Sequence, residues 1–369
     1  MDISQLKKVE LEITSACNAL CPGCARTDEL KKGKLNITSF SLDDLKRIFP
    51  PANYDGVEFK FCGVLGDPAI HPQFADMLEY LLENQGMISI STNGAVGTAD
   101  MWTRLGHMCA KYQYKFHLHW CVDGHKETNH IYRVNTKFNT VARNMQAFSN
   151  YAPEGSASWI YILFDHNEHE LEKAKIHAQT LGFTFATRTG MRNSYHDWIA
   201  KISKKDKKIK KVVVEEKKIT TTGSKEHSKK NDVKDLDKFI SEYKMRKQTK
   251  NFETKKQEIL KTVVCKYIHE GEIFIASYLT LWPCCFLWDS AFKNKEGILD
   301  KLNQFEPNWN NLKHHSKEEI LKHPWYSKLL AASWDPAHDL HLTRCIRTCA
   351  KNKAYHNEIN YVDNGISTV

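Results

Sequence analysis

The chain has 369 residues, of which 41% are hydrophobic, and its formal net charge is +9 at pH 7. The length suits two domains, and the apolar fraction is adequate for a globular core. No run of residues approaches the ~20 apolar positions of a membrane span, so we expect a soluble protein without membrane contact.

The positive charge belongs mainly to one segment, residues 201–261. This segment holds 21 of the 53 Lys and Arg residues and 10 of the 44 Asp and Glu residues, a net charge of +11, which leaves −2 for the rest of the chain. Lysine-rich, polar, weakly periodic sequence is typical of a solvated insertion. We therefore expect residues 201–261 to be a partly disordered linker, with a polar helix over 234–261. Binding of nucleic acid there is the less favoured interpretation.

Six segments have the apolar pattern of strands, and five helical segments lie between them. The predicted strands are residues 8–14, 57–61, 87–92, 115–122, 158–164 and 183–188. The predicted helices are residues 42–48, which Ser41 caps, and 73–83, 100–111, 139–148 and 168–181. This alternation predicts a parallel sheet with right-handed crossovers.

Three cysteines follow the first strand in a CxxxCxxC spacing: Cys17, Cys21 and Cys24. The chain has 11 cysteines, an odd number, and no apolar leader before the first strand. We therefore expect free thiols in a reducing cytoplasm rather than a disulfide framework. Three thiolates are one fewer than a cubane iron–sulfur cluster usually takes, which leaves one iron open for chemistry. Structural zinc is the alternative, although no fourth Cys or His lies close by in the sequence.

Polar motifs also follow the next three strands. They are Gly66-Asp67-Pro68, Thr92-Asn93-Gly94, and Asp123-Gly124 with Arg133 further on. In parallel α/β folds the functional groups gather at the carboxyl ends of the strands, so we expect these motifs to meet the cysteine loop at one mouth.

These motifs resemble those of the radical S-adenosylmethionine (SAM) superfamily. The resemblance implies that Cys17, Cys21 and Cys24 hold a [4Fe–4S] cluster whose open iron binds SAM. SAM is then cleaved to a 5′-deoxyadenosyl radical that abstracts hydrogen from the substrate. The family carries Glu where this chain has Asp67, and Ser where it has Cys121.

The same resemblance implies which residues contact SAM. Gly66, Asp67 and Pro68 correspond to the family's segment at the SAM amino group, and Thr92, Asn93 and Gly94 to its segment near the ribose and methionine. Asp123 belongs to a further family motif, whose arginine corresponds to Arg133. That guanidinium suits the SAM carboxylate, and a surface salt bridge is the alternative. Asn167 either contacts the nucleoside of SAM or caps the start of a helix.

A second group of cysteines lies in the last third of the chain. Cys265 precedes a predicted two-strand hairpin over 273–282, which leads to Pro283-Cys284-Cys285, and Cys345 and Cys349 follow far downstream. This number is too large for core packing alone and predicts a further metal centre. Cys62 and Cys109, in contrast, are expected to pack in or near the core.

This region resembles the twitch domain, the shortened SPASM domain of many radical SAM enzymes. The resemblance implies an auxiliary [4Fe–4S] cluster held by Cys265, Cys284, Cys345 and Cys349, with Cys285 pointing elsewhere. Four thiolates also suit structural zinc, which stays open as the alternative.

The sequence thus predicts a partial (β/α)6 TIM-like barrel over 1–200, the insertion over 201–261, and a small α+β cluster domain over 262–369. The resemblance implies an enzyme that acts on a peptide, sugar or other small molecule and takes electrons from a donor such as flavodoxin or ferredoxin. Two alternatives remain: an RNA-modifying enzyme that uses the basic insertion, and a noncatalytic iron–sulfur or zinc scaffold.

Overall fold

The structure is a computed structural model that describes residues 3–188, 263–303, 308–335, 338, 341–349 and 359–361. The basic insertion over 201–261 and the polar helix expected within it lie outside the described residues. The domain boundaries near residues 200 and 261 lie there as well, so the proposed division into domains stays a prediction.

A nine-stranded sheet with strand order β8-β7-β1-β2-β3-β4-β5-β6-β9 organises the described chain. The seven strands from β7 to β6 are parallel, and β8 and β9 pair antiparallel at the two edges. Among the described residues the edges do not pair with each other, so the sheet is an open, partial barrel, as predicted. The strands are β1 (Lys8–Leu11), β2 (Glu58–Phe61), β3 (Met87–Thr92), β4 (Phe116–Cys121), β5 (Ala157–Ile162), β6 (Thr184–Arg188), β7 (Glu272–Ile275), β8 (Leu281–Trp282) and β9 (Ile359–Tyr361).

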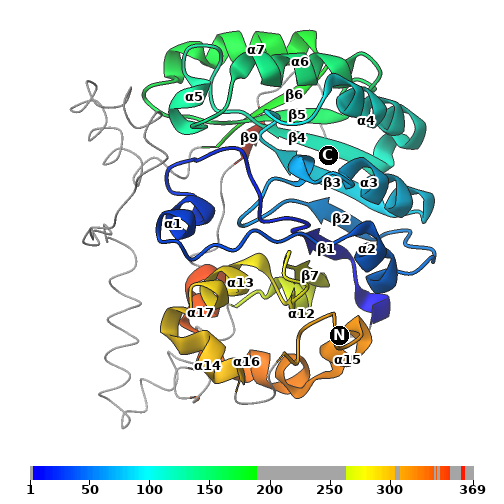
Figure 1. The fold of residues 1–369 in the computed structure, drawn as a ribbon, viewed down its shortest axis with the longest axis vertical. Helices are drawn as coiled ribbons and strands as arrows, with labels where there is room; N and C mark the ends of the chain where they lie inside the picture. Colours follow the sequence, from blue (N-terminus) through cyan, green and yellow to red (C-terminus); the bar gives the residue numbers. More distant parts are fainter. Residues whose placement is uncertain are drawn as a thin grey trace.

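Helices α2, α3, α4, α6 and α7 connect successive parallel strands and pack along the sheet, whereas α12 to α17 gather beside β7 (Figure 1). Within the described residues, no helix is long and apolar enough to cross a membrane. The helices are α1 (Ala25–Lys31), α2 (Leu42–Ile48), α3 (Phe74–Glu83), α4 (Ala99–Tyr112), α5 (Asn129–Tyr132), α6 (Phe138–Ser149), α7 (Leu171–Thr180), α12 (Lys266–Glu270), α13 (Cys285–Phe292), α14 (Ile298–Asn303), α15 (Lys317–Lys322), α16 (Leu330–Ala332) and α17 (Thr343–Cys349).

The local sequence explains these elements well. The predicted cap of α2 is a complete capping box, because Ser41 Oγ accepts from Asp44 N and the Asp44 carboxylate accepts from Ser41 N, both over 3.1 Å. The segment predicted as one helix over 168–181 divides into a 3-10 turn, Glu168–Glu170, followed by α7. Strand ends differ from the predicted ends by up to three residues, which is common where a strand runs into a loop.

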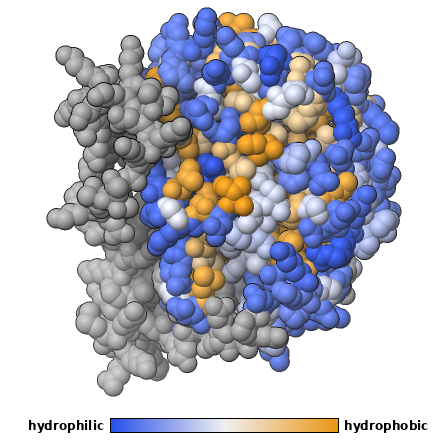
Figure 2. Space-filling view, viewed as in Figure 1, coloured by the Kyte–Doolittle hydropathy of each residue, from blue (hydrophilic) through white to orange (hydrophobic). Residues whose placement is uncertain are grey.

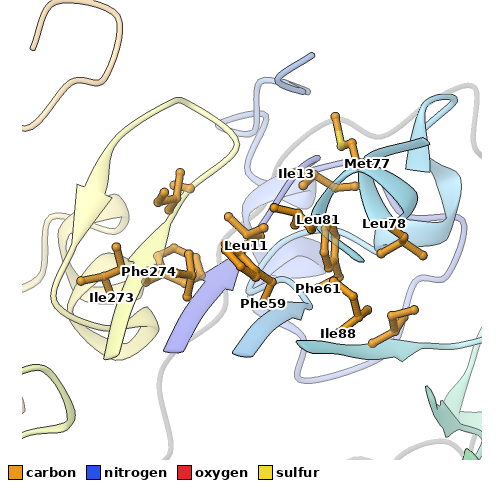
Figure 3. Packing of buried hydrophobic residues seen from close by; sticks show 14 of the residues in the cluster. Leu11, Ile13, Phe59, Phe61, Met77, Leu78, Leu81, Ile88, Ile273 and Phe274 are labelled. Carbon is orange, nitrogen blue, oxygen red and sulfur yellow. The ribbon is translucent and has the colours of Figure 1, made fainter. Parts of the chain in front are cut away.

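Alternation along the strands separates an apolar face from a polar one. On β1, Val9 and Leu11 are fully buried, and Leu11 lies with Phe59 and Phe61 in the apolar packing beside α3 (Figure 3). Glu10 lies on the opposite face of β1, where its Oε1 accepts from Lys60 Nζ over 2.6 Å. The inner face of the half-barrel is therefore polar.

The predicted hairpin over 273–282 is confirmed as β7 and β8, in which Phe274 pairs with Trp282. Its first strand also pairs parallel with β1, in the register Val9 to Ile273, and Glu12 N donates to Ile275 O over 2.9 Å. The C-terminal region thus extends the same sheet as the N-terminal region.

Candidate metal and cofactor sites

The loop after β1 brings Cys17, Cys21 and Cys24 together at the carboxyl end of the parallel strands. All three thiols belong to one small apolar cluster. The other members of this cluster are Ala19, Tyr132, Ile162 and Phe164. The loop is fixed to the segment after α5, because Leu20 N donates to Val134 O over 2.9 Å. The first thiol group therefore lies where the strands converge.

Nitrogen donors face two of these three sulfurs. Ala19 N lies 3.4 Å and Asn93 Nδ2 3.7 Å from Cys17 Sγ, and Arg133 Nη1 lies 3.9 Å from Cys21 Sγ. Hydrogen bonds to cysteine sulfur are one of the means by which a protein tunes the potential of an iron–sulfur cluster. The donor set and its surroundings thus fit such a cluster.

The buried thiols resist ionisation in the metal-free chain. Burial raises the pKa of Cys17 to about 12, and the charge of Asp67 adds to this increase. Burial also raises the pKa of Cys21. A bound metal must therefore displace these protons, as is usual for thiolate ligands. Within the described ranges, no three Cys, His, Asp or Glu side chains converge on one point as the ligands of a single metal ion do.

Asp67, expected at the SAM amino group, is 5% exposed and already binds donors from its own chain. Its Oδ1 accepts from Ala69 N over 3.1 Å and from Thr92 Oγ1 over 2.8 Å, while Oδ2 accepts from Asn93 N over 2.7 Å. The carboxylate therefore joins the loop after β2 to the end of β3.

Gly66 lies where no side chain fits. A Cβ atom there would stand 1.8 Å from the carbonyl oxygen of Thr14, and the next residue, Asp67, donates from its backbone N to Ala16 O over 2.9 Å. The loop after β2 thus packs directly on the backbone that leads into the cysteine loop.

The Thr92-Asn93-Gly94 segment continues this connection. Asn93 Nδ2 donates to Asn18 Oδ1 over 2.9 Å as well as facing Cys17, and Asn93 Oδ1 accepts from Ala95 N over 2.8 Å. Gly94 has φ +71°, and a Cβ there would meet the Trp120 ring at 2.7 Å. Three motifs that are far apart in the sequence thereby meet around Cys17.

Asp123 and Arg133 form a buried ion pair at the end of β4. Arg133 Nε donates to Asp123 Oδ2 over 2.7 Å, and Ile162 N donates to Asp123 Oδ1 over 2.7 Å. Asp123 is 0% exposed, whereas the Arg133 side chain is 17% exposed. Arg133 thus forms a salt bridge, but a largely buried one, and its contact with the SAM carboxylate stays a prediction.

Asn167 is engaged entirely with backbone groups. Its Nδ2 donates to the carbonyls of Asp123 and Ile162, both over 2.9 Å, and its Oδ1 accepts from Phe164 N over 2.8 Å. It precedes the 3-10 turn without a side-chain cap bond. Its side chain therefore braces the loops after β4 and β5.

Four cysteines of the second group line one pocket. Cys265, Cys284, Cys345 and Cys349 all line it, together with apolar groups such as Leu287. Cys285 does not line this pocket. The four cysteines named from the sequence thus come together, and the fifth does not join them.

Burial also raises the pKa values of the thiols that line this pocket. It raises the pKa of Cys284 to about 12, with Cys265 and Cys349 adding to the increase, and it raises the pKa of Cys349 to about 11. The backbone joins both ends of the region, because Val264 N donates to Cys349 O over 2.9 Å.

Sequence reasoning missed two buried acids, Glu10 on β1 and Glu12 directly after it. Glu12 is 0% exposed, its Oε2 accepts from Leu65 N over 2.7 Å, and Ser277 Oγ lies 3.4 Å from its Oε1. Burial raises the pKa of Glu12 to about 7. The signal that could have indicated these acids is their alternation with apolar residues just before the cysteine motif.

Known proteins resemble parts of this chain. No family model matches the chain. The tungsten-containing aldehyde ferredoxin oxidoreductase cofactor-modifying protein of Pyrococcus furiosus is 32% identical over 106 residues, 28% of each chain. Streptococcus suis SuiB bound to its precursor peptide SuiA superposes with a TM-score of 0.50 at 12% identity, over 89% of this chain and 66% of that one. Native anSMEcpe with bound AdoMet and the Cp18Cys peptide gives a TM-score of 0.44 at 16% identity, over 86% and 81%.

The superposition on SuiB shows that the two chains share an α/β fold, to which the open, mostly parallel sheet of this chain belongs. This chain spans about two thirds of the SuiB chain and little more than a quarter of the archaeal protein. The activities and ligands of these proteins therefore enter only as proposals for this chain.

Proposed function

We propose that the chain is a radical SAM enzyme whose Cys17, Cys21 and Cys24 hold a [4Fe–4S] cluster with one open iron. The observation that supports this most strongly is the convergence of the motifs after β2, β3 and β4 on the cysteine loop, through Asn93 at Cys17 and Arg133 at Cys21. When bound, the cluster and SAM supply a 5′-deoxyadenosyl radical that abstracts hydrogen from the substrate.

The chain's own residues would bind and orient SAM. Gly66, Asp67 and Pro68 would form one wall of the SAM site, and Thr92, Asn93 and Gly94 the adjoining wall. Because three donors from the chain already engage the Asp67 carboxylate, we assign it a positioning role. Arg133, held by Asp123, would direct its guanidinium to the SAM carboxylate.

We further propose that Cys265, Cys284, Cys345 and Cys349 hold an auxiliary [4Fe–4S] cluster, with zinc as the alternative occupant. Their shared pocket supports a common ligand. For the substrate, a peptide is the first class to test, because SuiB binds a precursor peptide, and sugars and other small molecules follow. The electron donor would be a flavodoxin or ferredoxin.

The test is an iron and sulfide count after anaerobic reconstitution, combined with 5′-deoxyadenosine formation from SAM and dithionite. We expect about eight irons in the wild type and about four in the variant with Cys17, Cys21 and Cys24 changed to Ala, which forms no deoxyadenosine. Cys109→Ser is the control because Cys109 is a buried thiol on α4 whose Sγ lies 4.0 Å from Phe116 O, at the start of β4 and so at the opposite end of that strand from the motif that follows it. SAM cleavage that survives the triple substitution contradicts the assignment.

Two further measurements, SAM binding and RNA affinity, separate the alternatives. A noncatalytic scaffold binds metal but neither binds nor cleaves SAM. An RNA-modifying enzyme that uses the basic insertion shows RNA affinity that falls steeply with salt and is lost when residues 203–255 are deleted.

A further inference from the structure

The segment that follows the first cysteine group lies at the surface. Cys24 is the N-cap residue of α1 and is half-buried, and Gly23 beside it is exposed. Cys21, in contrast, is 7% exposed and packs against Tyr132 and Phe164. The cysteine loop therefore continues through Cys24 into an exposed part of the molecule.

The exposed charges of this segment are mainly positive. Lys31, Lys32 and Lys34 are all exposed around the turn that ends α1. Glu29 is only 4% exposed and accepts from Lys32 Nζ over 2.8 Å, which leaves Asp28 as the one exposed acid between residues 25 and 40. A negatively charged protein that approaches Cys24 from this side meets a favourable potential.

Apolar side chains accompany these lysines. Seven large apolar side chains of the described chain are exposed, and two of them, Leu30 at 40% and Ile37 at 54%, lie in this one short segment. Figure 2, viewed as in Figure 1, shows apolar and charged side chains next to one another on the face that includes α1. Electron-transfer complexes are small and transient, so a few such residues are enough for an encounter.

We propose that α1 and residues 32–37 form the docking surface for a small acidic one-electron carrier protein. The inference rests on the proposed function, in which a cluster at Cys17, Cys21 and Cys24 takes its electron from outside. Lys31 and Lys34 steer the partner, and Leu30 and Ile37 supply the apolar contact. Because α1 begins directly after Cys24, a partner seated there lies beside the cluster.

Binding tests the surface without any turnover. Oxidised flavodoxin is titrated calorimetrically into the reconstituted enzyme at low and at physiological salt. We expect the double variant Lys31→Glu/Lys34→Glu to bind on the order of tenfold more weakly at low salt, and the wild type to approach it as salt rises. The matched control, Lys173→Glu/Lys313→Glu, reverses two exposed lysines on α7 and before α15 and should bind like the wild type.

Reduction kinetics separate this proposal from the proposed function. Reduced flavodoxin should reduce the double variant on the order of tenfold more slowly than the wild type, whereas dithionite, which needs no docking surface, should reduce both equally and give equal SAM cleavage. Equal rates with flavodoxin, or equal slowing in the control variant, overturn the docking surface. A wild type that cleaves no SAM even with dithionite overturns the proposed function instead. If the double variant loses self-association in sedimentation rather than flavodoxin binding, the surface is an interface between copies and the proposal is wrong.

Discussion

Arg133 connects Asp123, at the end of β4, to Cys21 in the cysteine loop. Its Nε donates to Asp123 Oδ2 over 2.7 Å, and its Nη1 lies 3.9 Å from the Cys21 sulfur. Because Asp123 is wholly buried and its second oxygen binds Ile162 N, the guanidinium is held on a rigid support. The position of the arginine relative to the cysteine loop is therefore set by the sheet.

We expect Arg133→Met to destabilise the protein by about 3–5 kcal/mol, because it leaves the Asp123 carboxylate buried without its cation. Changing Asp123 to Asn in the same chain should restore part of the loss. Urea unfolding of the metal-free variants measures both effects.

The matched control is the half-exposed pair of Lys8 and Glu58, whose side chains are 28% and 31% exposed. Lys8→Met should cost less than about 1 kcal/mol, because water screens this pair. Similar losses in the two Met variants would show that burial of Asp123 does not decide the cost.

The role of Asp67 shows what sequence spacing can and cannot establish. Its place after a strand, between Gly66 and Pro68, predicted that it would lie at the mouth of the sheet. The spacing could not show that Thr92 and Asn93 would donate to both of its oxygens, since those donors belong to the next strand. Side-chain partners across strands depend on register, which a single sequence does not reveal.

We expect Asp67→Asn to lower the free energy of unfolding by about 1–3 kcal/mol. The amide must turn its NH2 group toward Asn93 N on one side or Thr92 and Ala69 on the other, and a buried donor then faces a donor. Chemical denaturation measures the loss. Asp55→Asn is the control, because the Asp55 side chain is 71% exposed, and it should stay within about 0.5 kcal/mol of the wild type. Equal effects of the two substitutions would contradict the positioning role.

Several features escaped prediction for physical reasons, among them helix α1 and the pairing of β7 with β1. Helix α1 buries Arg26, Thr27 and Glu29, so it carries no apolar periodicity that would reveal it. The pairing of β7 with β1 joins residues more than 250 positions apart, and only the folded sheet brings them together. Strands with local alternation and helices with strong apolar stripes, by contrast, were predicted close to their final bounds.

Glu12 should make stability depend on pH. Its carboxyl pKa is raised by burial from 4.5 to about 7, so between these values the folded state holds a proton that the unfolded state has released. Stability therefore falls as pH rises through this range, and Glu12 costs about 3 kcal/mol once both states are ionised.

Glu12→Gln keeps an acceptor for Leu65 N but removes the titration. The stability of the Gln variant relative to the wild type should thus rise by about 3 kcal/mol between pH 4.5 and pH 8 in urea unfolding. An unchanged difference would show that Glu12 does not titrate there.

The adjacent pair Cys284 and Cys285 gives the sharpest test of the second centre. Cys284 lines the pocket that it shares with Cys265, Cys345 and Cys349, whereas Cys285 does not, and the charge of Glu10 acts on the Cys285 thiol instead. We expect Cys284→Ala to lose about half of the reconstituted iron, about four atoms, because a cubane deprived of a ligand is poorly held.

Cys285→Ala should keep the full iron content, although it changes the neighbouring residue on the same segment. Iron and sulfide analysis of both variants, with zinc measured in parallel, distinguishes a second cluster from a zinc site. Loss of about one zinc and no iron from Cys284→Ala would assign the pocket to zinc. Equal iron loss from both variants would mean that Cys285 is needed to hold the metal as much as Cys284 is, and the assignment of Cys285 as a residue that does not bind the metal would be wrong.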